Sequence, residues 1–266
     1  MSFADLFPAG RVAVIAHRGG SRLRPENTIA AFDQAASLRV DALECDVHLS
    51  RDEVPVVIHD ATLDRTTDAT GAVSTRTADE LARVDAGYRF ETDGRFPFRG
   101  QGVGVPRLSE LLAAVPAGRL IIELKQGLPE LARAVLAEIR KADAVERVCV
   151  GSFYRTGLDI LRAEAPEIAT SASQEEARWT LYRSWCRWPI AQRRPYVAFQ
   201  VPQRAGRLRV ISPAFLAQAH RDQARVDVWV VDEPSDIIRL LGCGVDGVIS
   251  DRPDLAVATR NSWCRR

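Results

Sequence analysis

Short apolar runs of strand length alternate with amphipathic helical stretches along most of this 266-residue chain. Near-continuous apolar strands separated by helices indicate a parallel sheet that is covered on both faces. Eight strand–helix units in about 250 residues fit a (β/α)8 TIM barrel, while counting alone leaves a doubly wound α/β sheet open. The eight expected strands carry Val14, Glu44, Glu123, Val150, Ile168, Phe199, Trp229 and Ile249.

One long polar segment interrupts this alternation. Residues 60–105 are rich in Thr, Asp, Gly and Arg and offer a single short helical stretch, so they are too polar for an independent core. We therefore predict one domain over residues 1–266, in which residues 60–105 are a small insertion after the second strand and its hairpin. Residues 259–266 are expected to form a flexible tail.

The second strand and the run after it, residues 43–60, carry an informative polar pattern. Glu44 and Asp46 alternate with apolar residues, so they share one face of a strand. If residues 52–53 form a two-residue hairpin loop, His59 lies directly across from Asp46 on that face. Glu53 is poorly suited to the positive φ of such a loop, so a different turn and register stay open.

Three carboxylates are expected near the C-terminal ends of neighbouring strands, where a barrel places its functional site. Glu44, Asp46 and Glu123 would offer hard oxygen ligands, which suit Mg²⁺ or Ca²⁺ better than zinc. Each carboxylate alone is more simply an ion-pair partner at a strand end. Three on adjacent strands, two of them spaced i, i+2, favour a site for one divalent cation.

Two of the four histidines, His17 and His59, each end an apolar strand. An imidazole pair can supply one acid and one base near neutral pH. The alternative for a lone histidine is a structural hydrogen bond to backbone at the strand end. We interpret His48 in that structural sense and His220 as a surface residue.

Two cations and one aromatic residue are candidates for substrate binding. Arg18 begins a glycine-containing turn whose backbone N–H groups can approach an anion closely. Lys125 lies two residues beyond Glu123, on the same strand face, in a chain with only two lysines. Both cations would complement a phosphate. Trp229 fits the barrel core and an aromatic substrate wall equally well.

Composition narrows the partners and the compartment. The net charge of +1 gives no basic field for nucleic acid. No apolar run reaches the roughly 18 residues of a membrane span, and the first residues lack the pattern of a signal peptide. Five scattered cysteines without a CxxC pair indicate a reducing compartment, so we expect a cytoplasmic protein.

Residues 174–194 combine four aromatic residues at helical spacing with five arginines. Such a stretch either packs against the barrel or makes peripheral contact with lipid. It follows the C-terminal end of a predicted strand, so it would stand over the mouth of the site.

A set of ordered motifs spans nearly the whole chain. The motifs are AHRGG (16–20), PENT (25–28), LECDV (43–47), VVIHD (56–60), IELK (122–125), VWVVDEP (228–234) and GVDGVISDRPD (244–254). In this order they resemble the glycerophosphodiester phosphodiesterases, a family of phospholipase-C-like phosphodiesterase barrels. The resemblance implies metal ligands at Glu44, Asp46 and Glu123, an acid/base pair at His17 and His59, and an insertion after the second histidine.

The resemblance also implies a reaction, the hydrolysis of a glycerophosphodiester to glycerol 3-phosphate and an alcohol. Either water or the glycerol 2-hydroxyl could be the nucleophile, and either histidine could be the base. A lysophospholipase D that acts on lysophospholipids is an alternative, and a catalytically silent barrel that binds an anion or lipid is another. The alcohol, the choice between Mg²⁺ and Ca²⁺ and the oligomeric state are left open.

Overall fold

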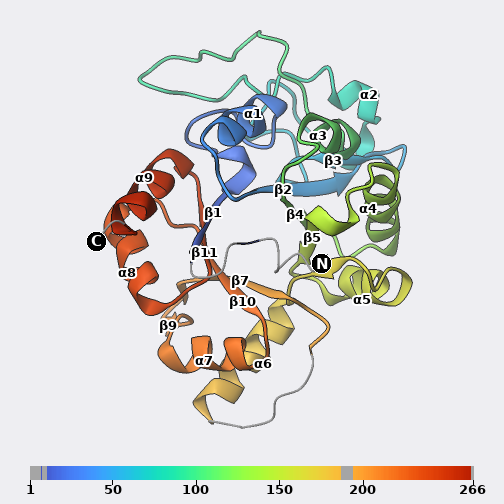
Figure 1. Cartoon of the computed structure of the whole chain (residues 1–266). Helices are drawn as coiled ribbons and strands as arrows, with labels where there is room; N and C mark the ends of the chain where they lie inside the picture. The colour runs from blue at the N-terminus through green and yellow to red at the C-terminus, as the bar shows by residue number, and fades with distance from the viewer. Residues whose placement is uncertain (1–6, 8–10, 187–193, 265–266) are drawn as a thin grey trace.

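Eight parallel strands form a nearly closed barrel in the computed structural model, which describes residues 7, 11–186 and 194–264 (Figure 1). A parallel bridge between Ser171 and Ala198 joins the two ends of the strand order, so the sheet is a barrel and not a doubly wound sheet. In spatial order the strands are β6 (Ala169–Thr170), β5 (Val148–Ser152), β4 (Leu120–Leu124), β2 (Ala42–Leu49), β1 (Ala13–Ala16), β11 (Gly247–Ser250), β10 (Arg225–Trp229) and β7 (Ala198–Pro202). The predicted TIM-barrel fold is confirmed.

Helices surround the strands on the outside of the barrel (Figure 1). They are α1 (Ile29–Ser37), α3 (Leu108–Ala114), α4 (Pro129–Lys141), α5 (Arg155–Glu164), α6 (Gln174–Trp185), α7 (Pro213–Arg221), α8 (Pro234–Cys243) and α9 (Pro253–Trp263). Four of them begin with proline in the first turn, where its missing N–H costs no hydrogen bond. Among the described residues, no helix has the length and apolarity needed to cross a bilayer.

The alternation along β2 shows how the core and the site divide the two faces of the sheet. Cys45 and Val47 are fully buried in the apolar layer between the strands and the helices. Ala42 instead joins the small cluster that fills the barrel interior. Because side chains alternate along a strand, Glu44 and Asp46 share the face of Ala42, nearer the C-terminal end. The interior is therefore apolar at one end and acidic at the other.

The hairpin register differs from the prediction by one residue. Strand β3 (Pro55–Val57) pairs antiparallel with β2, and Val47 lies opposite Val57. Asp46 consequently faces Ile58, whose N–H donates to the Asp46 carbonyl at 3.0 Å, and the expected pairing with His59 is wrong. The loop has three residues, 51–53, and Glu53 has φ +59°. This turn needs one left-handed residue, whereas the two-residue type I′ loop needs two, which non-glycine residues strongly disfavour.

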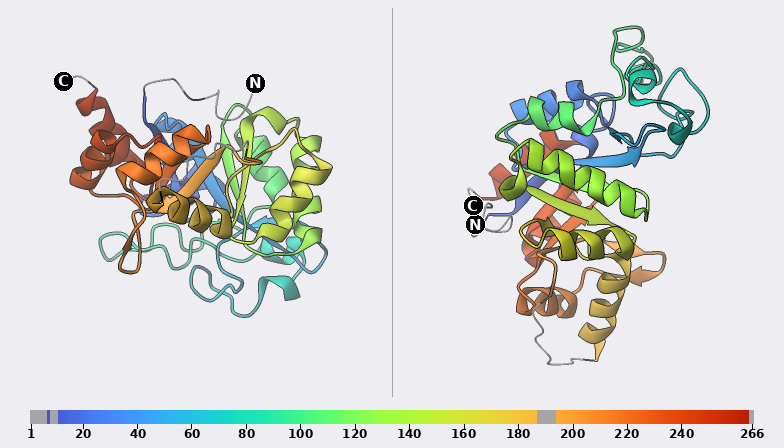
Figure 2. Two further views of the ribbon diagram at one scale, coloured as in Figure 1. Left: turned by 90° about the horizontal axis from the view of Figure 1, so that it is seen from below. Right: turned by 90° about the vertical axis from the view of Figure 1, so that its right-hand side faces the viewer.

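The insertion packs on this hairpin, and the right view of Figure 2 shows β2 extending past the barrel toward it. It contains little regular structure, namely α2 (Ala78–Leu81) and a 3-10 turn at Val73–Thr75. Its buried residues, Leu63 and Leu81 among them, form an apolar cluster that Val56 and Ile58 of the hairpin complete. The insertion thus draws part of its core from the hairpin.

The predicted flexible tail at residues 259–266 is wrong for residues 259–263, which belong to α9. Arg260 anchors this last turn because its side chain is only 2% exposed and forms an ion pair with Asp41. Its Nη1 also donates to the carbonyl of Val12 at 3.3 Å. Residues 265–266 lie outside the described part of the chain.

Candidate active site

The acidic cluster forms where β2 and β4 run side by side, because their register places Asp46 next to Glu123. Glu44 lies two residues earlier on the same face of β2. One carboxylate oxygen from each of the three residues lies within 4.8 Å of the others. Glu44 and Asp46 are buried, and Glu123 is partly buried. The three carboxylates predicted from the sequence therefore converge.

Burial makes this cluster costly to ionise. Desolvation, helped by the charge of Asp46, raises the pKa of Glu44 to about 8. Desolvation and Asp46 also raise the pKa of Glu123, although Lys125 opposes the change. For Asp46, burial is outweighed by Lys125 and Arg18, which hold the pKa of its carboxyl below the usual range. A bound cation would relieve the remaining repulsion.

The donor set fits a hard divalent cation. All three side chains offer carboxylate oxygens, as Mg²⁺ and Ca²⁺ prefer. Asp46 Oδ1 is buried and accepts no hydrogen bond from the described residues, although Lys125 Nζ lies 3.3 Å away. Among the described residues, the three carboxylates also outnumber the two permanent cations, Arg18 and Lys125, that lie within ion-pair distance of them. A dication would reverse that balance and let the cluster attract an anion.

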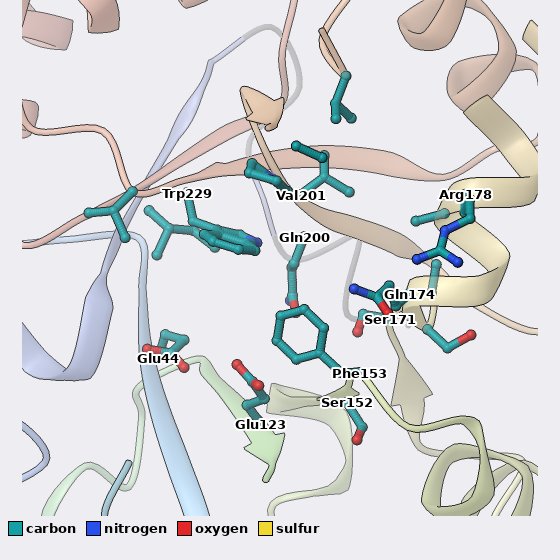
Figure 3. A pocket seen from close by; sticks show the side chains of 18 of the residues that line it. Glu44, Glu123, Ser152, Phe153, Ser171, Gln174, Arg178, Gln200, Val201 and Trp229 are labelled. Carbon is teal, nitrogen blue, oxygen red and sulfur yellow. The ribbon is translucent and has the colours of Figure 1, made fainter. Parts of the chain in front are cut away.

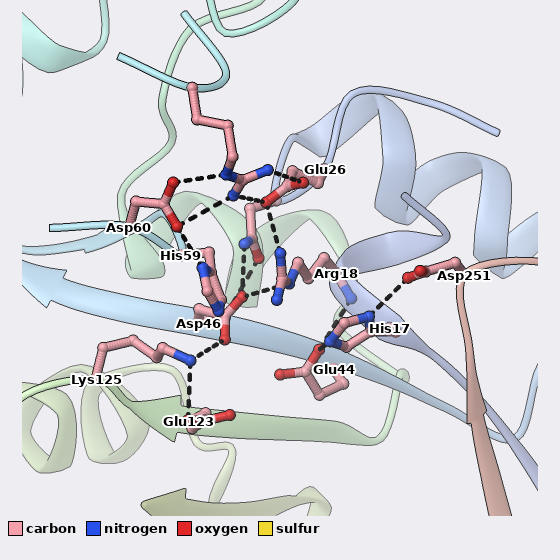
Figure 4. A network of polar contacts seen from close by, with 12 residues as sticks. His17, Arg18, Glu26, Glu44, Asp46, His59, Asp60, Glu123, Lys125 and Asp251 are labelled. Carbon is pink, nitrogen blue, oxygen red and sulfur yellow. Dashed lines mark hydrogen bonds and ion pairs between the residues drawn. The ribbon is translucent and has the colours of Figure 1, made fainter. Parts of the chain in front are cut away.

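His17 follows β1 and is held by the end of the last strand. The β1–β11 register pairs Ala16 with Ser250, so the next residues, His17 and Asp251, are neighbours. His17 Nδ1 lies 2.6 Å from Asp251 Oδ1, while Nε2 lies 4.0 Å from Glu44 Oε2 (Figure 4). Burial alone would lower the pKa of His17, but Asp251 and Glu44 outweigh it and raise it. Nδ1 therefore donates to Asp251, and Nε2 remains for chemistry.

The turn after His17 places Arg18 against the acidic cluster. Arg18 itself has φ +52° and Gly19 has φ +80°. A Cβ at Gly19 would lie 2.7 Å from the Cβ of Ala31, so only glycine fits there. The Arg18 backbone N–H donates to Glu44 Oε2 at 2.9 Å, and its Nε lies 3.1 Å from Asp46 Oδ2. The turn thus fixes Arg18 at the rim of the carboxylates.

His59 reaches the site from the chain that leaves β3, not from a cross-strand pair. Its Nδ1 lies 2.5 Å from Asp60 Oδ1, and its carbonyl accepts a hydrogen bond from His48 Nε2 at 3.0 Å. This contact gives His48 the structural role expected of it. Against the effect of burial, Arg65 and His59 hold the pKa of Asp60 at about 2. Asp60 is thus ionised and orients the imidazole.

An ion-pair chain connects the surroundings of the two histidines (Figure 4). Arg65 bridges Asp60 at 2.6 Å and Glu26 at 2.7 Å, and Glu26 accepts from Arg18 Nη1 at 2.9 Å. Arg18 then contacts Asp46. The positions of His59 and Arg18 are therefore mutually dependent.

Lys125 Nζ lies between two of the carboxylates, 3.0 Å from Glu123 Oε1 and 3.3 Å from Asp46 Oδ1. Burial would lower the pKa of this ammonium group, but Asp46 and Glu123 outweigh it and raise the pKa. Lys125 is thus a permanent positive charge beside the acidic cluster.

A cavity of about 560 Å³ opens above these residues. At one end its wall is polar, and the predicted residues that line it are His17, Arg18, Glu44, His59, Glu123, Lys125 and Trp229. Asp46 lies within the acidic cluster behind them. The rings of Trp229 and Phe153 meet edge to face, with their centroids 6.2 Å apart. They lie between this polar end of the cavity and the end that Gln174 and Arg178 line (Figure 3). All eight residues predicted from the sequence therefore gather at one place.

Sequence reasoning gave no role to several residues that hold the site together. Asn27 donates from Nδ2 to Asp46 Oδ2 at 2.8 Å and accepts from the Asp46 backbone N–H at 3.2 Å. Asp251 holds His17, and Arg65 connects Asp60 to Glu26. Asn27 belongs to the PENT motif, and Asp251 belongs to the GVDGVISDRPD motif. The motifs indicate that both residues matter, but they do not show which partner each residue has.

Fold and site together define a TIM-barrel phosphodiesterase. The sequence profile of the glycerophosphoryl diester phosphodiesterase family matches residues 17–255, and the chain belongs to this family. The resemblance seen in the motifs is thereby confirmed, as is the enzyme class that it implied.

Relatives of full length support this assignment. The chain is 34% identical over 262 residues to the probable glycerophosphodiester phosphodiesterase 2 of Mycobacterium tuberculosis. The matched region covers 96% of this chain and 93% of the relative. It is 29% identical over 252 residues to the glycerophosphodiester phosphodiesterase of Caldanaerobacter subterraneus subsp. tengcongensis, at 93% and 97% coverage.

Solved structures share the fold over nearly all of the chain. A putative glycerophosphoryl diester phosphodiesterase from Silicibacter pomeroyi superposes with a TM-score of 0.77 at 28% identity, covering 96% of this chain and 95% of that one. An Oleispira antarctica phosphodiesterase in complex with the product sn-glycerol-3-phosphate superposes with a TM-score of 0.79 at 26% identity, covering 98% and 100%.

Proposed function

We propose that this protein hydrolyses glycerophosphodiesters to glycerol 3-phosphate and an alcohol, with a divalent cation at Glu44, Asp46 and Glu123. The observation that carries the proposal is the pair of histidines at the cavity, each bound through Nδ1 to a carboxylate. Such binding leaves Nε2 of both His17 and His59 free to exchange a proton with the substrate. The solved relative that contains sn-glycerol-3-phosphate supports the choice of substrate.

The positive groups at the site would bind and orient the phosphodiester. The cation would act as a Lewis acid on the phosphate oxygens. Arg18 offers a guanidinium, which matches two phosphate oxygens at once, and Lys125 offers a compact charge. Both are held in place by carboxylates before any substrate arrives, so little reorganisation is needed when charge develops at phosphorus.

The two histidines would divide the proton transfers. One removes a proton from the nucleophile, which is water or the glycerol 2-hydroxyl of the substrate. The other donates a proton to the leaving alkoxide. When the 2-hydroxyl is the nucleophile, the alcohol leaves as a cyclic phosphate forms, and water then opens that ring to give glycerol 3-phosphate. Asp251 and Asp60 fix the tautomer of each ring, and Asp251 also stabilises the protonated form of His17. Each proton transfer is typically worth about 10²–10⁴-fold in rate.

Substitution of each histidine tests the proposal. With glycerophosphocholine as substrate, His17→Ala and His59→Ala should each lower kcat about 10²–10⁴-fold. His220→Ala is the matched control, because His220 pairs with Asp246 at the surface, away from the cavity. Near-native turnover by either active-site variant would refute the assignment.

The cavity favours one alternative substrate enough to name it. Beyond the polar end, its wall is largely apolar and includes Leu181, Val201, Leu208 and Val210. A hydrocarbon chain could occupy this part, as in lysophospholipase D chemistry on a lysophospholipid. Comparing kcat/KM for glycerophosphocholine and lysophosphatidylcholine decides between the two substrates. A silent binding barrel would hydrolyse neither.

A further inference from the structure

The cavity opens beside an unusual concentration of exposed aromatic side chains on α6. Trp179, Tyr182 and Trp185 are 58%, 45% and 51% exposed. Their spacing of three residues places them along one side of the helix. The inner side of α6, with Ala177 and Leu181, faces the cavity and the core instead. About half of each of these aromatic side chains is therefore exposed to solvent.

The β8–β9 hairpin (Arg204–Ala205 and Leu208–Arg209) flanks the same cavity. Arg204 and Leu208 line it from this hairpin, as Arg178 does from α6. Residues 204–209 are all exposed, and residues 201–210 include no acidic residue. We call the exposed aromatic side of α6, together with Arg178 and this hairpin, the mouth patch.

The mouth patch is positively charged. Arg178, Arg204, Arg207 and Arg209 have no acidic partner within 4.0 Å in the described part of the chain. Other arginines near α6 do form ion pairs, as Arg162 does with Glu176, but they are not part of the mouth patch. Glu175 is the one exposed acid of α6, since Glu176 is held by Arg162. The patch thus offers four arginines against one carboxylate.

We propose that the mouth patch docks the protein on an anionic lipid bilayer. Tryptophan and tyrosine favour the interface between water and lipid because their rings are apolar and their edges can bond to headgroups. Arginines beside them are attracted by anionic headgroups. The Tyr182 and Trp185 rings already meet edge to face at 5.4 Å, so little side-chain entropy is lost on docking.

Charge argues against a second copy of this chain as the occupant. A twofold interface would bring the arginines of both patches into one contact with a single carboxylate from each copy to offset them, and like charges repel. An anionic lipid surface complements both properties of the patch. Docking would also turn the mouth of the cavity toward lipid, from which phosphodiesters of membrane origin could enter. The docking does not depend on the proposed reaction.

Binding to vesicles tests the proposal. The protein should sediment with vesicles of phosphatidylcholine that contain phosphatidylglycerol, less with phosphatidylcholine alone, and less at raised salt. A Trp179→Ser, Trp185→Ser variant and an Arg207→Ser, Arg209→Ser variant should each bind about tenfold more weakly. None of these four residues lines the cavity, so turnover of glycerophosphocholine should stay unchanged.

Two matched controls separate the patch from general effects of losing a tryptophan or an arginine. Trp263 is the last residue of α9 and is 39% exposed, and Arg83 is an exposed arginine that closely follows α2 in the insertion. Figure 1 shows both α9 and α2 away from α6. Trp263→Ser and Arg83→Ser should bind as the unaltered protein does. The proposal is overturned if the unaltered protein ignores anionic vesicles, or if patch and control variants bind alike. It is equally overturned if the unaltered protein is a dimer that Trp179→Ser dissociates and that binds no vesicles.

Discussion

Replacing Asp251 by asparagine should separate the positioning of His17 from the presence of its imidazole. Asp251 Oδ1 lies 2.6 Å from His17 Nδ1, and the two side chains are only 20% and 16% exposed. The asparagine keeps the shape of the side chain and removes its charge. It therefore abolishes the charge-assisted hydrogen bond while His17 itself remains.

The expected magnitude follows from that hydrogen bond. A bond to a charged partner contributes about 1.5–3 kcal/mol. At about 1.36 kcal/mol per factor of ten in rate, kcat/KM for glycerophosphocholine should fall about 10–100-fold. Since Asp251 helps to raise the pKa of His17 against burial, its loss should lower that pKa. The limb of the pH–rate profile that belongs to His17 should then move to lower pH.

Steady-state rates across the pH range measure both effects. Asp254→Asn is the matched control, because Asp254 is paired with Arg252 at the surface and does not line the cavity. It should leave the rate and the profile unchanged. If Asp251→Asn lowers the rate without moving either limb of the profile, the reasoning about His17 is refuted.

Further predictions concern stability. Gly19→Ala should lower the free energy of unfolding by about 3 kcal/mol, since it combines φ +80° with a severe contact, and urea titration measures this loss. Gly71→Ala, with φ +94° and open space, should cost only about 1 kcal/mol; equal losses would contradict the packing argument. Arg260→Leu should cost about 1.5–3 kcal/mol because it removes a charge-assisted hydrogen bond to Asp41, which keeps its ion pair with Arg11, and an unchanged urea midpoint would argue for a loose tail. Asp60, with its pKa lowered from 3.8 to about 2, contributes stability that is complete above 3.8 and lost as pH falls toward 2. Asp60→Asn should therefore flatten the acid side of the stability curve measured by denaturant unfolding at each pH, and an equally steep decline would show that Asp60 is not the cause.

The fold was predictable because its signal is repeated along the chain. Each of the eight strands is a short apolar run, and helix starts are marked by proline or by a capping residue such as Thr28 or Ser173. The acidic cluster was predictable because Glu44 and Asp46 obey the two-residue period of a strand and Glu123 ends the next barrel strand. Local periodicity sufficed for both.

The errors arose where a nonlocal or strained feature decides the outcome. The hairpin register depends on Glu53 adopting a left-handed conformation that its residue type does not favour. The end of α9 depends on Arg260 reaching Asp41, a residue 219 positions away. Asp251 could have been found, because closing a barrel pairs the last strand with the first and so brings this acid beside His17.

We propose that a divalent cation at Glu44, Asp46 and Glu123 is needed for the hydrolysis of glycerophosphodiesters. Release of glycerol 3-phosphate from glycerophosphocholine, followed after chelation and after return of Mg²⁺ or Ca²⁺, tests it most directly. Chelation should abolish the release, and return of one of the two cations should restore it. Full turnover in excess chelator would show that hydrolysis needs no cation at these carboxylates.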